Sequence, residues 1–282
     1  MALLELKDLH TFFRTKKGIV KAVNGVSYSV ETGRTLGVVG ESGSGKSVSA
    51  MSILQLLDGN GYIDSGEILF EGRDLTKLTE KEMYSVRGND ISVIFQEPMT
   101  SLNPVFTVSR QVSEPFIIHQ GMTKKQAAAK VIEMLADVKI PNPHIVAKQY
   151  PHQLSGGMRQ RVMIAMALAC KPKLLIADEP TTALDVTIQA QILKLMNDLK
   201  EEHGTSIIFI THDLGVIRQI ADDVAVMYCG QVVEMAPAGT IFMDAEFSHP
   251  YTEGLMNSIP RLSTPTHTRL DAIPGAVPHL SL

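Results

Sequence analysis

The chain lacks the features that would mark it as secreted, membrane-spanning or nucleic-acid-binding. It contains only two cysteines, Cys170 and Cys229, which lie far apart in the sequence. Two isolated cysteines argue against a disulfide framework, and we expect both to be buried, reduced thiols. The longest apolar runs, such as residues 162–170, are too short to cross a bilayer.

Positive charge is not in excess either. The chain carries 26 Lys and Arg against 30 Asp and Glu, a formal net charge of −4, so no cationic field suggests a nucleic-acid partner. The N-terminus has acidic residues and no signal-peptide layout, so we expect a cytosolic chain. The chain has 282 residues, of which 44% are hydrophobic, so we expect one large domain or a domain with an inserted subdomain.

Residues 40–47 read Gly-Glu-Ser-Gly-Ser-Gly-Lys-Ser, which matches the G-x-x-x-x-G-K-[ST] pattern of the P-loop. The glycines let several backbone N–H groups face one anion, and the following helix adds its positive N-terminal end. Lys46 would reach the β and γ phosphates of a nucleotide, and Ser47 would hold Mg²⁺. An apolar strand pattern precedes the motif and a helix pattern at residues 48–57 follows it. A glycine-rich surface loop is the alternative, and it would need neither neighbour.

Three further apolar runs predict buried strands with polar ends. Residues 90–96 end on Gln96, residues 173–179 end on Asp178 and Glu179, and residues 205–211 lead into His212. Because ligands of open α/β sheets bind at the carboxyl ends of strands, we expect Asp178 and Glu179 beside the P-loop. Asp178 would give a carboxylate to Mg²⁺, and Glu179 would polarise a water for attack on the γ-phosphate.

Helical and β patterns complete the chain. Residues 105–147 read as helical, which predicts an inserted helical subdomain. Shorter patterns indicate strands at 4–9, 20–30 and 66–72, helices at 79–87, 186–202 and 214–221, a hairpin at 224–234 and a weak helix at 251–258. Phe12 and Phe13 lie between the first two strands, and either could be a core aromatic or a ring that stacks on adenine.

Residues 154–158, Leu-Ser-Gly-Gly-Met, directly precede an apolar-rich helix at residues 159–170. Ser155 is placed to cap that helix, and Gly156 and Gly157 would let an anion approach its first N–H groups. An ordinary cap with flexible glycines explains the pattern equally well.

In their order along the chain, these motifs resemble those of the ATPase subunits of ABC transporters, over nearly the whole length. The matching segments are Walker A at 40–47, the Q-loop at Gln96, the signature at 154–158, Walker B with its glutamate at 174–179, the D-loop at 183–185 and the switch His212. The resemblance implies an α/β fold, a P-loop NTPase core with an antiparallel β subdomain and an inserted helical subdomain. It places the ATPase domain at 1–260, the helical insertion at about 98–170 and a tail at 261–282.

The same resemblance assigns the site residues. The expected catalytic residues are Glu179, His212 and Lys46. Binding of ATP falls to Phe13, Gly40, Glu41, Ser42, Gly43, Ser44, Gly45, Lys46, Ser47, Val48, Gln96, Ser155, Gly156, Gly157 and Asp185. The expected ligands of Mg²⁺ are Ser47, Gln96 and Asp178. Phe12 remains an alternative to Phe13 as the aromatic residue that stacks on adenine.

The resemblance also implies partners. Two ATPase subunits would form a head-to-tail dimer, so that Ser155, Gly156 and Gly157 serve the other subunit's nucleotide. The second subunit would be an identical copy or a homologous chain. Two membrane-spanning permease subunits and an external substrate-binding protein would complete the complex, with this chain peripheral on the cytoplasmic face of the membrane.

Several segments resemble the branch that imports dipeptides and oligopeptides. They are residues 95–104, 154–161 with Met158, 179–185, 249–252 and 273–275. We therefore expect an ATPase that powers peptide import. Members of this branch often continue into a cysteine-rich tail that holds an iron–sulfur cluster. This sequence lacks those cysteines, so either the chain is shortened or this member has no cluster.

Other functions remain as alternatives. Nickel or another small solute is the second candidate for the cargo. A soluble ABC-type ATPase of DNA repair or translation would typically show coiled coils or a second P-loop, and neither pattern is present. A P-loop kinase disagrees with residues 154–158 and His212, and a module that holds ATP without hydrolysis disagrees with Glu179.

Overall fold

The structure is a computed structural model that describes residues 2–96, 101–182, 184–244 and 249–258. The chain divides into two compact units. The first contains the described residues up to Leu78 and from Ile208 onward, and the second is Thr79–Ile207. The division falls within strand β8 (Ser206–Ile210). The predicted domain limits at 98, 170 and 260 stay predictions, and the predicted tail lies outside the described residues.

The first unit carries most of the β structure. Its other strands are β1 (Ala2–Thr15), β2 (Gly18–Glu31), β3 (Thr35–Val39), β4 (Gly61–Phe70), β5 (Arg73–Asp74), β9 (Asp223–Tyr228) and β10 (Gln231–Pro237). Its helices are α1 (Lys46–Ile53), α9 (Leu214–Ile220) and α10 (Pro250–Asn257), with a 3₁₀ turn η1 (Leu75–Lys77) and a π-helical turn η3 (Thr240–Asp244). The strands form an antiparallel sheet in the order β2-β1-β4-β5 and a second group in which β10, β9, β3 and β8 are neighbours.

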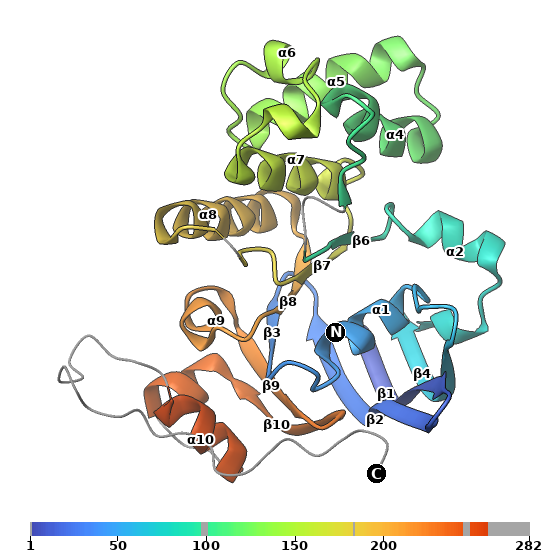
Figure 1. Ribbon diagram of the computed structural model, residues 1–282, viewed down its shortest axis with the longest axis vertical. Coiled ribbons are helices and arrows are strands. Elements are labelled where there is room, and N and C mark those ends of the chain that lie inside the picture. Colours follow the sequence, from blue (N-terminus) through green and yellow to red (C-terminus); the bar gives the residue numbers. More distant parts are fainter. Residues whose placement is uncertain (1, 97–100, 183, 245–248, 259–282) are drawn as a thin grey trace. The chain divides into compact units, whose positions relative to one another are not determined.

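Helix α1 packs on the antiparallel sheet, as Figure 1 shows for β1, β2 and β4. The Thr11 hydroxyl lies 2.8 Å from the Ser52 hydroxyl, and both side chains are buried. Tyr28 on β2 lies 3.5 Å from Ser49 of the same helix. A buried polar group needs a partner, so these pairs fix the helix to the sheet. Since α1 follows the P-loop directly, the antiparallel sheet positions the loop.

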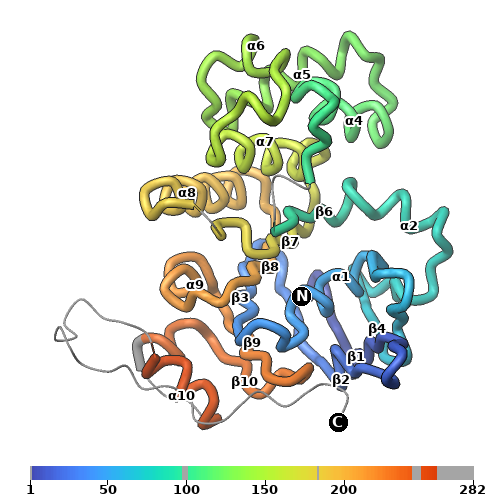
Figure 2. The backbone as a smooth tube through the Cα atoms, in the orientation of Figure 1, coloured from blue at the N-terminus to red at the C-terminus, as the bar shows by residue number. Residues whose placement is uncertain are grey.

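The second unit combines two parallel strands with a group of helices. Its strands are β6 (Ile91–Ile94) and β7 (Leu174–Asp178), which pair in parallel. Its helices are α2 (Glu80–Val86), α4 (Val108–Gln120), α5 (Lys124–Asp137), α6 (Pro143–Val146), α7 (Gly156–Leu168) and α8 (Val186–His203), with a 3₁₀ turn η2 (Pro151–Gln153). Helices α4, α5 and α7 pack on one another (Figure 2).

Local sequence signals set these helix limits. Thr123 and Gln126 form a reciprocal capping box at the start of α5, which satisfies two backbone N–H groups that a helix leaves without partners. On the same helix Ala127, Val131 and Leu135 are buried at spacings of four residues. That spacing places them on one face, which packs into the interior of the unit. Helix α5 thus confirms helical structure within the predicted stretch 105–147.

The predicted first strands are too short. The expected runs at 4–9 and 20–30 are parts of one long hairpin, β1 with β2, closed by a turn at Thr15 and Gly18. Phe12 and Phe13 therefore lie within β1, not between strands. The pattern hid this because β1 contains register shifts, with Asp8 at φ 47°, that break the strict alternation.

Two other boundaries differ as well. The predicted helix at 48–57 ends earlier, because α1 stops at Ile53 and Gln55 has φ 52°, outside the helical region. The predicted strand at 66–72 is β4, which begins at Gly61, where the Phe13 ring packs so closely that a Cβ would meet it at 2.7 Å. The hairpin at 224–234 is confirmed as β9 with β10.

The absences noted in the sequence also have structural counterparts. Cys170 and Cys229 are free thiols, but each is half-buried, so the expectation of full burial is wrong. Along the described stretches of the chain, no helix has both the length and the apolar character needed to span a membrane.

Candidate functional site

The P-loop lies in the first unit, between β3 and α1, and close backbone contacts require two of its glycines, Gly40 and Gly45. Gly40 has φ 151° and Gly45 has φ 97°. A Cβ at Gly40 would lie 2.1 Å from the Met227 carbonyl oxygen, and one at Gly45 would lie 2.3 Å from the Ala22 carbonyl oxygen. Only glycine fits such an approach, so strands β2 and β9 fix the course of the loop.

Lys46 is buried beneath this loop, with 5% of its side chain area exposed. Its ammonium group donates to the Gly40 carbonyl at 2.7 Å and to the Glu41 carbonyl at 2.8 Å. A buried cation at a helix N-terminus creates a site for an anion. Phosphate oxygens would give Lys46 hydrogen bonds in which both donor and acceptor are charged, whereas the carbonyl acceptors are neutral. The loop is thus built to hold phosphate.

The other loop residues differ in exposure. Ser42 and Gly43 are exposed, Glu41, Ser47 and Val48 are half-buried, and Ser44 is buried. The Ser44 carbonyl accepts a hydrogen bond from the Gly230 N–H at 3.0 Å, so the turn between β9 and β10 supports the loop from one side. Ser47 is the second residue of α1 and follows Lys46 directly in the sequence.

His212 also belongs to the first unit, at the carboxyl end of β8. The Thr211 N–H donates to the Val38 carbonyl on β3 at 3.3 Å, so the end of β8 lies beside the strand that leads into the P-loop. Asp213 caps α9 by accepting from the Gly215 N–H at 2.8 Å. These two bonds hold His212, which is exposed, at the strand end where the sequence placed it.

The second unit brings Gln96 and Glu179 together. Strands β6 and β7 pair in parallel, with Ile94 opposite Ala177, so they end at the same edge. The Gln96 side-chain amide donates to Glu179 Oε2 at 3.1 Å. The Thr182 hydroxyl donates to the same oxygen at 2.9 Å. Glu179 is half-buried, while the adjacent Asp178 is buried with 6% exposed.

The signature residues lie at the start of α7 in the same unit. Ser155 caps the helix, as predicted, by accepting from the Met158 N–H at 3.3 Å. Ser155 and Gly156 are exposed and Gly157 is half-buried. Asp185 caps α8 through the Ile188 N–H at 2.9 Å, and its side chain is exposed. Ala183 of the same predicted loop lies outside the described residues.

The predicted site residues thus fall into two groups. Phe13, the P-loop residues 40–48 and His212 belong to the first unit, and Gln96, Ser155, Gly156, Gly157, Asp178, Glu179 and Asp185 belong to the second. Within each unit the strand ends lie as expected. The predicted approach of Asp178 and Glu179 to the P-loop stays a prediction.

Phe12 and Phe13 face different surroundings on β1. The Phe12 ring meets Tyr62 edge-on, with centroids 6.3 Å apart, and also meets His10. Phe13 follows Thr11 by two residues, in a stretch where β1 and β4 pair in regular register. It therefore shares the face of Thr11, whose hydroxyl contacts α1. Phe13 thus lies on the face of β1 toward α1, the helix that follows the P-loop, and its stacking on adenine stays a prediction.

Two contacts escaped the sequence analysis. Thr182 holds Glu179, and the Tyr251 hydroxyl oxygen accepts a hydrogen bond from the Glu41 N–H at 3.0 Å. Tyr251 lies in the 249–252 segment that resembled the peptide-importer branch, but nothing in the pattern linked it to a loop 210 residues away. Only the folded chain brings them together.

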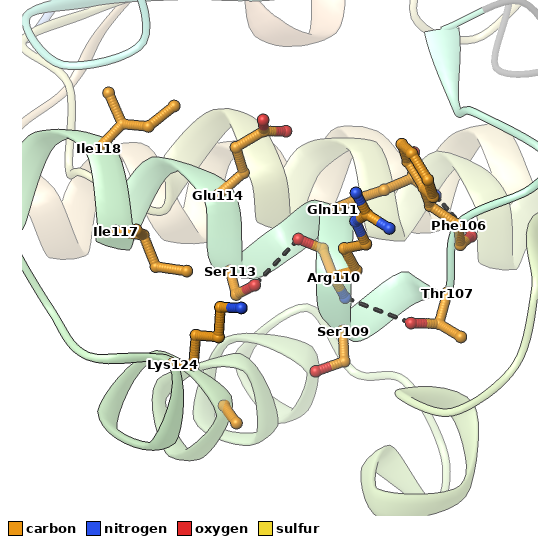
Figure 3. A pocket seen from close by; sticks show the side chains of 11 residues that line it. Phe106, Thr107, Ser109, Arg110, Gln111, Ser113, Glu114, Ile117, Ile118 and Lys124 are labelled. Carbon is orange, nitrogen blue, oxygen red and sulfur yellow. Dashed lines mark hydrogen bonds between the residues drawn. The ribbon is translucent and has the colours of Figure 1, made fainter.

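A cavity of about 660 Å³ opens in the second unit between α4 and α5 (Figure 3). Arg110 stacks on the Phe106 ring, 3.5 Å from its centroid, and the Gln111 amide donates to the Phe106 carbonyl at 2.9 Å. Ile117 lies toward one end of the cavity and Lys124 borders it from α5. The hollow is amphipathic, and none of the predicted nucleotide residues lines it.

Comparisons with known proteins show the family of the chain. Residues 23–182 match the model of the family described as "ABC transporter". Residues 233–281 match "Oligopeptide/dipeptide transporter, C-terminal region". The chain is 55% identical to the oligopeptide transport ATP-binding protein OppD of Bacillus subtilis, over 99% of this chain and 78% of OppD. It is 51% identical to the dipeptide transport ATP-binding protein DppD of the same organism, over 98% of this chain and 82% of DppD.

Solved structures show the same fold. The ATP-binding cassette MJ0796, in a dimeric post-hydrolysis state bound to ADP and Pi, has a TM-score of 0.75 and 29% identity, covering 83% of this chain and 98% of that one. CbiO1 of Clostridium perfringens, part of the ABC transporter complex CbiONQ, has a TM-score of 0.73 and 27% identity, covering 86% of this chain and 92% of that one.

These findings confirm the predicted α/β P-loop fold of the ABC ATPase type and the predicted nucleotide-binding activity. They also confirm the resemblance drawn from the motifs. The chain belongs to the ABC transporter ATP-binding proteins, in the branch that carries the oligopeptide/dipeptide transporter C-terminal region.

Proposed function

We propose that this chain binds Mg-ATP on the P-loop and hydrolyses it to power the import of short peptides. The observation that carries the proposal is the buried Lys46, held by the carbonyls of Gly40 and Glu41 in a loop that only glycine can form. A cation at a helix N-terminus favours the binding of an anion, and the match to the ABC transporter family indicates that this anion is a nucleotide. Phe13 would stack on the adenine ring.

Glu179 would act on the attacking water. As the water oxygen bonds to the γ-phosphorus, the bond to the bridging oxygen breaks, ADP leaves and the water proton passes to Glu179. The present hydrogen bonds from Gln96 and Thr182 orient the carboxylate. His212, at the end of β8, would position the γ-phosphate and the water. Lys46 would hold the β and γ phosphates and stabilise the charge that develops on them.

The donors for Mg²⁺ fit a hard cation. Ser47 offers a hydroxyl from the start of α1, Asp178 a buried carboxylate from the end of β7, and Gln96 an amide oxygen. Mg²⁺ in nucleotide sites usually takes one or two protein oxygens, and phosphates and waters complete the shell. The bound ion would neutralise phosphate charge. Ser47, Asp178 and Gln96 would hold and orient it.

The signature residues would serve a second subunit. Ser155 and Gly156 are exposed at the N-terminus of α7, where backbone N–H groups favour an anion. The P-loop belongs to the other compact unit, and MJ0796 is named as a dimer bound to ADP and Pi. A head-to-tail dimer, in which α7 and Asp185 of each subunit face the partner's nucleotide, accounts for this exposure. The partner is a second copy or a homologous subunit.

The chain would work on the cytoplasmic face of the membrane, docked on two membrane-spanning permease subunits. The exposed helices of the second unit would form the docking surface. Gln96, whose side chain donates to Glu179, would connect that surface to the catalytic carboxylate. An external substrate-binding protein would deliver cargo. Peptides are favoured over nickel or another small solute, because residues 233–281 match the oligopeptide/dipeptide C-terminal region and OppD and DppD are named for peptides.

Reconstitution of the complete complex in vesicles tests this proposal. ATP turnover is measured with the binding protein present and either dipeptides or nickel chelates added. We expect peptides to stimulate turnover and nickel chelates to leave it at the basal rate. Stimulation by the metal complex alone would overturn the cargo and leave the ATPase intact, whereas a complex without ATP turnover would contradict the whole proposal.

A further inference from the structure

The C-terminal helix α10 places a tyrosine against the P-loop. Its first residues, His249, Pro250 and Tyr251, each have a local role in this placement. His249 Nδ1 accepts a hydrogen bond from the Tyr251 N–H at 3.1 Å, which caps the helix. Pro250 occupies the first helical position, where its missing N–H is not needed. Tyr251 is therefore held at a fixed point in the first turn.

The tyrosine side chain is buried, with 6% of its area exposed. Its ring lies against the ring of Tyr228, at the end of β9, with centroids 4.5 Å apart and planes inclined by 46°. Burial raises the pKa of Tyr251 to about 12, so the phenol is neutral at physiological pH. The ring pair holds the Tyr251 side chain with its hydroxyl at the Glu41 N–H of the loop.

Glu41 connects that hydroxyl to the phosphate cradle. Its N–H donates to the Tyr251 hydroxyl oxygen at 3.0 Å, and its carbonyl accepts from the Lys46 ammonium at 2.8 Å. The same residue is therefore held by α10 through its N–H and by the catalytic lysine through its carbonyl. A shift of Glu41 would move one of the two carbonyls that hold Lys46.

We propose that Tyr251 is a positioning residue for the P-loop, which pre-orders Glu41 so that Lys46 and the loop N–H groups converge before nucleotide binds. This inference rests on the proposed function, because it assumes that the loop holds ATP. It gives α10 and the C-terminal region a role at the nucleotide site itself. A loop that is ordered in advance loses less conformational freedom on binding, so its affinity is higher.

The test is Tyr251→Phe, which keeps the ring against Tyr228 and removes only the hydroxyl. Tyr228→Phe is the matched control, because it removes a hydroxyl from the same ring pair while the Glu41 N–H keeps its acceptor on Tyr251. Binding of a fluorescent ATP analogue to the full chain with Mg²⁺ gives the affinity. Turnover by the reconstituted complex gives kcat and KM separately.

One hydrogen bond is worth roughly a three- to tenfold change in a binding constant. We therefore expect Tyr251→Phe to bind the analogue about three- to tenfold more weakly and to raise KM for ATP equally, with kcat within about twofold of the parent. Tyr228→Phe should match the parent. Hydrogen exchange should show faster exchange at the Glu41 N–H in Tyr251→Phe alone, a measurement that needs no activity.

Three outcomes would overturn the inference. They are an analogue affinity within about twofold of the control, a tighter affinity, or unchanged exchange at Glu41. If Tyr251→Phe lowers the melting temperature while affinity and exchange stay as in the control, Tyr251 is a packing residue only. If the parent chain itself fails to bind the analogue, the proposed function fails, which is a different result.

Discussion

Gly45, in the loop 40–47 of the first unit, and Gly156, in the loop 154–158 of the second, have different surroundings. A Cβ at Gly45 would lie 2.3 Å from the Ala22 carbonyl, and Gly45 has φ 97°. At Gly156 the nearest atom to such a Cβ is Leu184 Cδ2, at 3.9 Å, an ordinary contact. The first unit needs its glycine for its own fold. The second unit has room for a side chain at Gly156, so its own packing does not require glycine at this position.

The functional side chains show the same contrast. Lys46 is buried and has its hydrogen-bond acceptors in place, whereas Ser155 and Gln96 are exposed. A preformed, buried site of this kind would bind phosphate without a second surface. An exposed helix start gains its ligand only when another surface closes over it. This difference is what a shared site between two subunits requires, and four substitutions test it.

The largest effect is expected for Lys46→Ala. The substitution removes the cation from the cradle, and hydrogen bonds to a charged group contribute about 1.5–3 kcal/mol each. Nucleotide affinity should fall at least about a hundredfold and ATP turnover should be lost. Lys17→Ala, at an exposed position in the turn between β1 and β2, is the control and should bind like the parent. Retained affinity in Lys46→Ala would contradict a preformed cradle.

Glu179→Gln should separate binding from chemistry. Glutamine keeps the shape and an oxygen for the Thr182 hydroxyl, but it cannot take the water proton. Turnover should fall at least about a hundredfold, the usual contribution of a general base, while nucleotide affinity stays within about twofold. Trapped ATP should then produce a dimer in analytical ultracentrifugation. Near-normal turnover by Glu179→Gln, beside an exposed control such as Glu202→Gln, would remove Glu179 from the catalytic role.

Much of this arrangement was predictable from local sequence, and the rest was not. The end of β7 at Asp178 and the end of β8 just before Thr211 and His212 follow from apolar runs that stop at polar residues. The helix starting after Thr123 follows from its capping box. The β1–β2 hairpin was underestimated, because its register shifts disrupt the alternation. The contact of Tyr251 with Glu41 depends on packing between segments 210 residues apart, which no local pattern encodes.

Gly45→Ala tests the requirement of the first unit, with Gly43→Ala as its matched control. Both positions have positive φ, 97° and 81°. Within the described residues, a Cβ at Gly43 would meet nothing within 4 Å beyond its chain neighbours, whereas one at Gly45 would meet the Ala22 carbonyl. Gly43→Ala should reduce the free energy of unfolding by about 1–2 kcal/mol, the strain of a left-handed residue. Gly45→Ala should lose about 3 kcal/mol or more, because the clash adds to that strain.

Urea unfolding of both variants measures the difference. Equal losses would show that the backbone of β2 yields at no cost, and the loop would then be less rigidly held than the 2.3 Å approach implies. Nucleotide affinity should follow the same order, since a displaced β2 contact alters the loop that holds Lys46.

Gly156→Ala is expected to have the smallest effect on the chain alone and is the sharpest test of the comparison. The residue is the first of α7, has no positive φ and is exposed. Alanine is a better helix former than glycine, so the free energy of unfolding should stay the same or rise by up to about 1 kcal/mol. ATP affinity of the isolated chain should be unchanged, because Gly156 lies outside the P-loop unit.

Dimerisation should nevertheless weaken. In the Glu179→Gln background, a methyl group at position 156 would stand where the γ-phosphate of the partner's nucleotide meets the start of α7. The ATP-dependent dimerisation constant should therefore fall about tenfold or more, which corresponds to a contact worth at least about 1.4 kcal/mol. Analytical ultracentrifugation with and without ATP measures it. Gly239→Ala is the matched control, because Gly239 is exposed, has no positive φ and, in the described part of the chain, has no atom within 4 Å of an added Cβ apart from its chain neighbours. An ATP-induced dimer of parental strength in Gly156→Ala would mean that the exposed α7 start is not the surface that closes on the partner, and the contrast between the two loops would need another explanation.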